Sequence, residues 1–203
     1  MAVILLIRHG ENDMVGKSLA GRLPDVHLNE KGQAQARQLA VGLASLPIKA
    51  VYASPLERAQ ETAAPIARVQ DLPVKTMPAL LEIDFGSWQG KRLSRLKKGR
   101  LWKTVQESPA SFRFPEGESF AEAQVRVAEG LVTVSEQFDK KDIVVCTAHS
   151  DVIRLAVAHF LGLPLDRFQR IRIAPASVTV LYLNGGEGFF GPINYVFGFP
   201  SLG

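Results

Sequence analysis

The chain has 203 residues, of which 46% are hydrophobic and 22% are charged, and its formal net charge is +4 at pH 7. This composition is ordinary for a globular protein, and the absence of any run of eighteen apolar residues argues against a helical membrane span. The length favours one domain over residues 1–203, with a substantial buried core.

The cysteine content and an arginine near the N-terminus indicate the cellular compartment in which we expect the protein. Cys146 is the sole cysteine, so no internal disulfide can form. Arg8 ends the first apolar run too early for the hydrophobic core of a signal peptide. We therefore predict a cytoplasmic protein that does not associate with membranes.

Four near-continuous apolar runs alternate with helical patterns along the chain. Strands that are covered on both faces give such runs, because neither face is left for polar residues. The alternation of strands and helices predicts an α/β fold with a mostly parallel central sheet, flanked by helices on both faces. We expect the strands at residues 2–7, 49–53, 142–148 and 177–183.

The helices between these strands have recognisable starts. Asn29 can cap a helix that extends to about Ser45. Ser54, Pro55 and Glu57 predict an N-cap, a first-turn proline and a capping-box carboxylate for the next helix. Two further helices are expected, one over 120–137 after the capping-box pair Ser119 and Glu122, and one between His149 and Gly162.

Cationic and imidazole side chains follow the ends of three expected strands. Arg8 and His9 follow the first strand, Arg58 lies in the first turn of the helix after the second, and His149 follows the strand at 142–148. Ligands bind beyond the carboxyl ends of strands in open α/β sheets, so these side chains should converge. Each alone could be structural, but together with two helix N-termini they predict an anion pocket, because arginine binds phosphate oxygens in bidentate fashion.

A proton donor for such a pocket is offered by LLEIDFGSWQG, residues 80–90, which carries Glu82 and Asp84. In an extended segment, residues two apart face the same side, so spacing alone leaves both carboxyl groups as candidates.

Five motifs together carry a resemblance to a known family. They are LIRHGEN (6–12), SPLERAQETA (54–63), LLEIDFGSWQG (80–90), PEGESF (115–120) and VVCTAHSDVIR (144–154). Their order resembles that of the histidine phosphatase superfamily, in the branch that contains cofactor-dependent phosphoglycerate mutases and small phosphomonoesterases. The resemblance covers about residues 3 to 183. It implies a phosphoglycerate mutase-like α/β fold and a phosphohistidine mechanism that uses no metal and no cofactor.

The resemblance also implies a role for each of these residues. His9 would be the nucleophile that accepts the phosphoryl group, while Arg8, Arg58 and His149 hold the transferring oxygens. Glu82 would protonate the leaving oxygen and later act as base on the hydrolytic water. Positioned cations suit this chemistry, because a phosphoryl transition state spreads negative charge over its equatorial oxygens.

Further substrate contacts are expected at Asn12, Ser18, Gly21 and Ser150. Family members commonly have an asparagine a few residues after R-H-G, where this chain has Val15, so that role would be unfilled or fall to Asn12 or Ser18. Asp151 brings an acid close to the pocket, which disfavours a highly charged substrate unless it points outward.

The leading hypothesis is a phosphomonoesterase acting on a small phosphorylated metabolite. A mutase that returns the phosphoryl group to its substrate is the nearest alternative, but such mutases usually have a longer segment than 90–118 here. A metal site of His9, His149 and Glu82 would place two arginines beside a divalent cation, which they would repel. A phospho-ligand-binding module without turnover is the least favoured hypothesis, because the expected catalytic residues are all present.

Other partners are not indicated. The basic run at 90–103 lacks the interleaved aromatic residues of single-strand nucleic-acid binders, and a solvated face explains it better than a rim that attracts anions. We expect no nucleic-acid partner and either a monomer or a homodimer.

Overall fold

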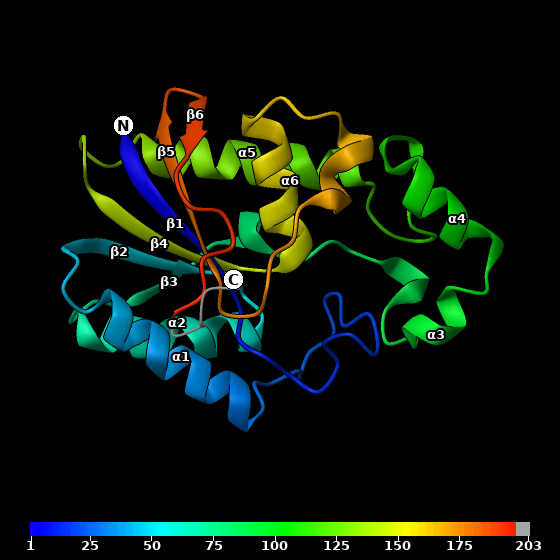
Figure 1. Ribbon diagram of the computed structural model, residues 1–203, viewed down its shortest axis with the longest axis horizontal. Helices are drawn as coiled ribbons and strands as arrows, with labels where there is room; N and C mark the ends of the chain where they lie inside the picture. The colour runs from blue at the N-terminus through cyan, green and yellow to red at the C-terminus, as the bar shows by residue number, and fades with distance from the viewer. Residues whose placement is uncertain (198–203) are drawn as a thin grey trace, which may run out of the picture.

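A computed structural model of the protein describes residues 1–197, so residues 198–203 of the predicted domain lie outside the described residues. Its centre is a six-stranded sheet in the order β3-β2-β4-β1-β5-β6 (Figure 1). The pairs β1–β4, β4–β2 and β2–β3 are parallel, and β5 pairs antiparallel with both β1 and β6. The strands are β1 Ala2–Arg8, β2 Ile48–Ala53, β3 Val74–Thr76, β4 Ile143–Ala148, β5 Val178–Asn184 and β6 Glu187–Phe190.

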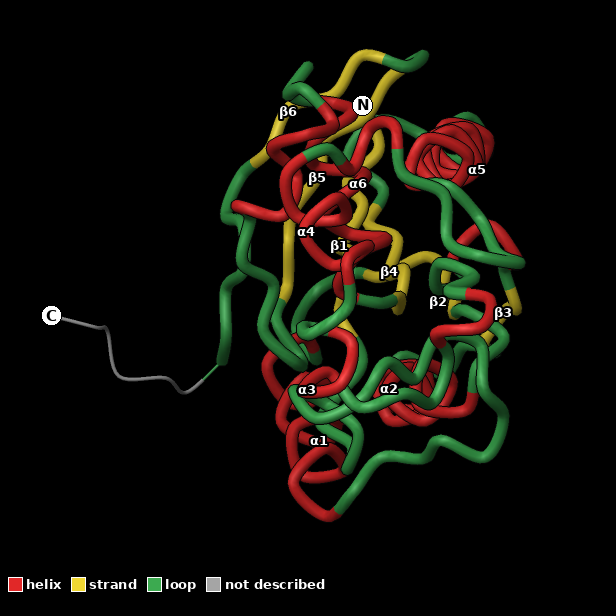
Figure 2. Tube along the Cα trace, turned by 90° about the vertical axis from the view of Figure 1, so that its right-hand side faces the viewer, coloured by secondary structure: helices red, strands yellow, loops and turns green. Residues whose placement is uncertain are grey.

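Helices cover both faces of this sheet (Figures 1 and 2). One face carries α1 and α2, which pack against each other, and the opposite face carries α5 and α6. The predicted α/β fold with a mostly parallel sheet and two helical layers is thus confirmed. The helices are α1 Glu30–Leu43, α2 Glu57–Val69, α3 Leu93–Leu96, α4 Arg100–Glu107, α5 Phe120–Ser135 and α6 Ser150–Phe160.

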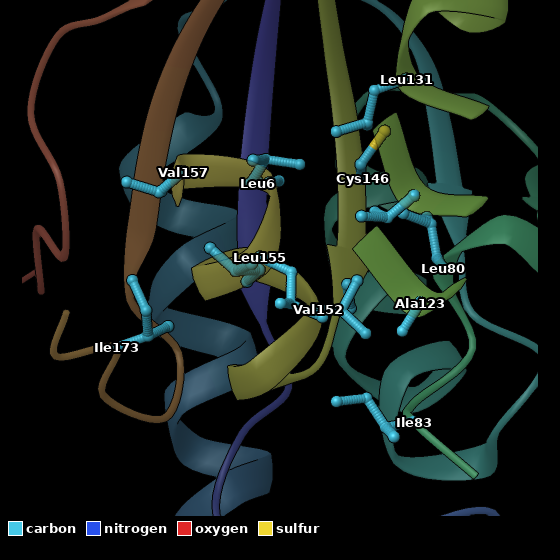
Figure 3. Close-up of a cluster of buried hydrophobic side chains, with 14 of the residues drawn as sticks. Leu6, Leu80, Ile83, Ala123, Leu131, Cys146, Val152, Leu155, Val157 and Ile173 are labelled. Carbon is cyan, nitrogen blue, oxygen red and sulfur yellow. The ribbon is translucent and has the colours of Figure 1, made fainter. Parts of the chain in front are cut away.

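The core has two halves, one on each face of the sheet, because successive residues of a strand point to opposite sides. Along β1, Leu5 and Ile7 join the cluster under α1 and α2, whereas Ile4 and Leu6 join the cluster under α5 and α6. Figure 3 shows the second cluster, which includes Cys146. Burial raises the pKa of the Cys146 thiol to about 12, so this side chain acts as an inert apolar residue.

Two of the predicted helix starts are formed as expected. The side chain of Asn29 accepts a hydrogen bond from the Gly32 amide at 2.9 Å and caps α1. Ser119 and Glu122 form a complete capping box at the start of α5. Both caps satisfy backbone N–H groups that the first helical turn leaves without partners.

The predicted start of α2 is wrong. The helix begins at Glu57 with Leu56 as its N-cap, and no side chain caps it. The Ser54 hydroxyl lies 2.8 Å from Nε2 of His149 and accepts from the Leu56 amide only at 3.4 Å. The shift leaves Arg58 in the first turn, as expected.

A segment without predicted helices lies beside the sheet. Figure 1 shows α3 and α4 at one side of the molecule, away from the strands. The basic side chains of 91–100 are exposed, as expected for a solvated face. Within residues 1–197, no helix is long and apolar enough to cross a membrane.

Candidate active site

A cavity of about 380 Å³ opens beyond the carboxyl ends of the parallel strands. This is the edge at which open α/β sheets bind ligands. Of the nine predicted site residues, all except His149 line the cavity. The lining residues among them are Arg8, His9, Asn12, Ser18, Gly21, Arg58, Glu82 and Ser150.

His9 is held as a neutral imidazole with one free nitrogen. Its side chain is 5% exposed, and Nδ1 lies 2.7 Å from the carbonyl oxygen of Gly10. That carbonyl can only accept, so Nδ1 carries the proton and Nε2 keeps its lone pair. Burial, followed by the charges of Arg8 and Arg58, lowers the pKa of His9 to about 3. The ring is therefore unprotonated and nucleophilic at neutral pH.

Two glycines allow the chain after His9 to pass close to α1. A Cβ on Gly10 would lie 2.7 Å from the carbonyl oxygen of Gly32, and a Cβ on Gly32 would lie 2.0 Å from that of Glu11. On the other side, the Gly10 amide donates to Oγ1 of Thr62 at 3.0 Å. Contacts from α1 and α2 thus fix the backbone that orients the His9 ring.

The two arginines carry buried donors that make no hydrogen bond within residues 1–197. Nη1 of Arg8 donates to the Ile173 carbonyl at 2.7 Å, and Nη2 of Arg58 donates to the Gly21 carbonyl at 2.7 Å. Nε of Arg8 and both Nε and Nη1 of Arg58 have no such partner. Arg58 is only 1% exposed. Since buried donors are nearly always satisfied, this cluster is built to receive an acceptor-rich anion.

His149 lies beside His9 but beneath the cavity surface. It is fully buried, and the centroids of the two rings are 5.3 Å apart. Burial, followed by the charges of Arg58, His9 and Arg8, lowers the pKa of His149 well below its usual value. Nε2 of His149 contacts the Ser54 hydroxyl, while Nδ1 is buried without a partner in the described chain. We refer to Arg8, His9, Arg58 and His149 together as the strand-end cluster.

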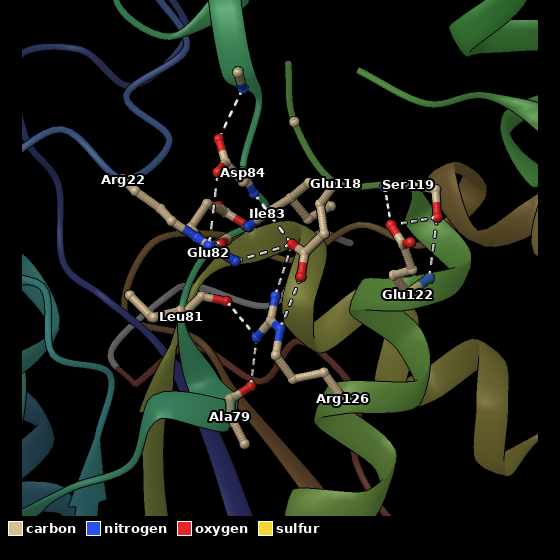
Figure 4. Close-up of polar contacts among 12 residues, drawn as sticks. Arg22, Ala79, Leu81, Glu82, Ile83, Asp84, Glu118, Ser119, Glu122 and Arg126 are labelled. Atoms are coloured by element: carbon tan, nitrogen blue, oxygen red, sulfur yellow. Dashed lines mark hydrogen bonds and ion pairs between the residues drawn. The ribbon is translucent and has the colours of Figure 1, made fainter. Parts of the chain in front are cut away.

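The structure shows which of Glu82 and Asp84 is placed to act as the general acid, a choice that their spacing in the sequence left open. Glu82 lines the cavity and is 8% exposed, and one carboxyl oxygen accepts from the Ile83 amide at 3.0 Å. Asp84 does not line it; its carboxylate accepts from the Gly86 amide at 2.8 Å (Figure 4). Burial, and next the negative charge of Asp151, raises the pKa of Glu82 to about 7, against the opposing effect of Arg58 and Arg8.

An ion-pair network that we did not predict holds the segment 79–84, which we call the acid segment. Arg126 donates to the carbonyls of Ala79 and Leu81 at 2.7 and 3.0 Å, and Arg22 donates to that of Glu82 at 2.8 Å. Glu118 accepts from both arginines at 3.0 Å (Figure 4). The PEGESF motif contains Glu118 and was the available signal for it.

The other predicted substrate-contact residues also line the cavity. Asn12 accepts through Oδ1 from the amides of Met14 and Val15 at 3.0 and 3.2 Å, which turns the chain. Gly21 has a φ of +55°, and its carbonyl anchors Arg58. Ser150 is the first residue of α6, where free backbone N–H groups favour an anion.

Asp151 also lines the cavity and does not point away from it. Arg154, one turn along α6, donates to its carboxylate at 2.9 Å and neutralises it. Nε of Arg154 is buried and makes no hydrogen bond in the described chain. We did not predict this pair as part of the site.

The alternative metal site is not formed. In the part of the chain that the structure describes, no group of three or more histidine, cysteine or acidic side chains is placed to hold a metal ion. That the enzyme uses no metal stays a prediction.

Comparison with known proteins agrees with this geometry. The pattern of the histidine phosphatase superfamily (branch 1) matches residues 4–194. The 2,3-bisphosphoglycerate-dependent phosphoglycerate mutase of Thermoplasma acidophilum is 32% identical, over 92% of this chain and 90% of that protein. Phosphoserine phosphatase 1 of Hydrogenobacter thermophilus is 30% identical, over 90% of this chain and 87% of that protein. The structure of Bacillus stearothermophilus YhfR superposes with a TM-score of 0.89 at 26% identity, over 97% of this chain and 98% of that one.

Paired histidines and arginines at the strand ends of an α/β sheet suit phosphoryl transfer, because they can hold the charged oxygens of the group. The chain belongs to the histidine phosphatase superfamily (branch 1), as its motifs predicted. The prediction of a phosphatase agrees with the matched family and with the phosphatases among its relatives, and it is confirmed at that level.

Proposed function

We propose that this protein hydrolyses phosphomonoesters of small metabolites through a phosphohistidine at His9. The observation that carries the proposal is the strand-end cluster, in which a neutral imidazole is surrounded by buried donors that have no hydrogen-bond partner within residues 1–197. A phosphoryl group would accept from Nε of Arg8 and from Nε and Nη1 of Arg58. His149 would add a donor at Nδ1, with the Ser54 hydroxyl donating to its Nε2.

In the first step, Nε2 of His9 attacks phosphorus and the bond to the ester oxygen breaks. Glu82, protonated, donates its proton to that oxygen, and the alcohol leaves. In the second step, Glu82 as carboxylate takes a proton from water, whose oxygen attacks phosphorus. The phosphorus–nitrogen bond then breaks and returns neutral His9. A pKa near 7 suits both roles, because Glu82 can exist in either form at neutral pH.

Charge inside the cavity supports a hydrolase over a mutase. A mutase must hold a second anionic group on its substrate. The cationic side chains that line the cavity are Arg8, Arg58 and Arg154. Two of these would bind the transferred phosphoryl group, and the third is already paired with Asp151 at 2.9 Å. No lining arginine or lysine is therefore left for a second phosphoryl group.

The test is transfer of label to the protein. Brief incubation with a ³²P-labelled phosphomonoester, followed by rapid quenching, should leave label that is stable in alkali and lost in acid. His9→Ala should acquire none, whereas His27→Ala, on an exposed histidine outside the cavity, should label normally. Equal labelling of His9→Ala would disprove the assignment. Conversion of 3-phosphoglycerate to 2-phosphoglycerate, with little release of phosphate, would show a mutase instead.

One domain over residues 1–203, a monomeric or homodimeric state and a cytoplasmic location also stay predictions. Cys146 is fully buried, which is compatible with a reducing compartment.

A further inference from the structure

A second cavity, of about 350 Å³, adjoins the first. The two share a boundary, because the same five residues line both: Leu19, Phe85, Leu93, Asp151 and Arg154. None of the strand-end cluster lines the second cavity. A substrate could therefore extend from the phosphoryl site into this space without leaving the protein.

Five aromatic side chains line the second cavity, beside five polar or charged ones, and we call it the aromatic cavity. The rings of Trp88 and Trp102 are stacked, with centroids 6.2 Å apart and an interplanar angle of 17°. Phe114 meets Trp88 edge to face at 5.5 Å, and Phe85 meets Phe114 in the same way at 4.8 Å. Flat apolar surfaces of this kind bind rings through offset and edge contacts. Covering them with a ligand also removes apolar area from water.

The aromatic cavity adjoins the phosphoryl site next to Phe85, a residue close in sequence to the general acid. In-line phosphoryl transfer places the leaving oxygen opposite the attacking Nε2 of His9, and the acid must reach that oxygen. His9 and Glu82 both line only the first cavity, whereas Phe85, three residues after Glu82, lines both. A leaving group directed away from His9 and toward Glu82 would thus meet the shared boundary.

The charges at this boundary favour an uncharged leaving group. Asp151 and Arg154 neutralise each other at 2.9 Å, so neither is free to bind a second ionic group. Nε of Arg154 remains as one buried donor, suited to a neutral oxygen. Lys97 also lines this cavity, but its ammonium group is exposed, so solvent and salt screen its charge.

We propose that the aromatic cavity receives the leaving group of the substrate, and that this group is an uncharged alcohol with an aromatic or flat apolar body. The proposal rests on the proposed phosphatase function and narrows its substrate class. Trp102 would be a specificity residue, because it lines the aromatic cavity and not the phosphoryl site.

The experiment compares 2-phenylethyl phosphate with ethyl phosphate. Both are esters of primary alcohols, so the reactivity of the leaving group differs little between them. We expect kcat/KM to favour the phenylethyl ester by about tenfold or more, since even one methylene in an apolar pocket can give tenfold discrimination. Trp102→Ala should remove most of this preference. Leu101→Ala, on the neighbouring exposed residue of α4, should keep it.

Fluorescence gives a second measurement that does not need a variant. Trp88 and Trp102 are the two tryptophans of the chain. Titration with 2-phenylethylphosphonate should change their fluorescence emission. The concentration at half of the full change should equal the inhibition constant of this compound. Ethylphosphonate, which would occupy only the phosphoryl site, should change it much less.

The outcomes separate the two proposals. Hydrolysis of both esters at similar kcat/KM, or equal emission changes with both phosphonates, would overturn the aromatic leaving group and leave the phosphatase intact. Failure to hydrolyse either ester, with a selective emission change, would overturn the phosphatase and keep the aromatic site. Absence of both ester hydrolysis and a selective emission change would overturn both the proposed phosphatase function and the aromatic leaving-group site.

Discussion

The strand-end cluster and the acid segment contribute to one cavity but are held in different ways. Backbone geometry places the first, since Arg8 ends β1, His9 follows it and His149 follows β4. Side-chain ion pairs place the second, through Arg22, Arg126 and Glu118. We therefore expect that mutations can weaken binding of the phosphoryl group without impairing proton transfer, and the reverse.

The largest effect is expected at the acid segment, from Glu82→Gln. General acid catalysis contributes about 10²–10⁴-fold, and the variant should lose this on ethyl phosphate. The loss should be much smaller for phosphohistidine formation from p-nitrophenyl phosphate, whose leaving group needs no proton. Asp84→Asn is the matched control, two residues away and outside the cavity lining, and should be mild on both substrates. A leaving-group-dependent defect in Asp84→Asn but not in Glu82→Gln would identify Asp84 as the acid.

The pH profile sharpens the same assignment. The acid must be protonated in the first step, so kcat/KM on ethyl phosphate should fall as pH rises through about 7, the pKa of Glu82. The nucleophile must be unprotonated, so a fall on the acid side should begin only as pH approaches about 3, the pKa of His9. With p-nitrophenyl phosphate, the fall above pH 7 should be weaker. A histidine NMR signal that titrates near pH 6.5 and is missing from His9→Ala would contradict a buried neutral His9.

The next largest effect is expected from Arg58→Met, which removes part of the strand-end cluster. Charge-assisted hydrogen bonds contribute about 1.5–3 kcal/mol each, so losing two donors should lower kcat/KM by about 100-fold or more. Inhibition by vanadate should weaken in parallel. The free energy of unfolding should stay within about 1 kcal/mol or increase, because the variant removes a buried cation with unpaired donors.

Arg68→Met serves as the control for Arg58→Met, since Arg68 is exposed near the other end of the same helix. It should change neither activity nor vanadate inhibition. Unchanged vanadate inhibition in Arg58→Met would show that this arginine does not bind the phosphoryl group.

The contrast between the two regions also explains what the sequence could predict. Strand ends are signalled locally, by an apolar run followed by polar residues, and their convergence follows from parallel pairing. The acid segment depends on distant partners, since Arg22 lies 60 residues from Glu82 and Arg126 lies 47 residues from Ala79. Neither partner has a local signal, so the choice between Glu82 and Asp84 needed the structure or the family resemblance.

Other elements that we missed have similar causes. The cap signal at Ser54 was valid locally, but α2 begins only at Glu57, and the Ser54 hydroxyl contacts His149, 95 residues away. The short helices α3 and α4 have no side-chain cap, which removes the signal that marked α1 and α5. The edge strand β3 has only three residues, too few for an alternating pattern.

The smallest effect we predict on turnover comes from loosening the acid segment with Glu118→Gln. The variant keeps the shape of the side chain but removes the charge that accepts from Arg22 and from both Nε and Nη2 of Arg126. The unfolding free energy should fall by about 1–3 kcal/mol, because two partly buried arginines lose their anion.

Steady-state kinetics should show whether Glu118 supports only the acid segment or also the strand-end cluster. If it positions Glu82 through the two arginines, kcat on ethyl phosphate should fall by about tenfold, within the range of general acid catalysis. Turnover of p-nitrophenyl phosphate and inhibition by vanadate should change little, because the strand-end cluster is fixed by the sheet. Glu129→Gln, on an exposed glutamate of the same helix α5, should change none of these quantities. Equal loss on both substrates, with weaker vanadate inhibition, would instead mean that Glu118 supports the whole cavity, and the two regions would not be independent.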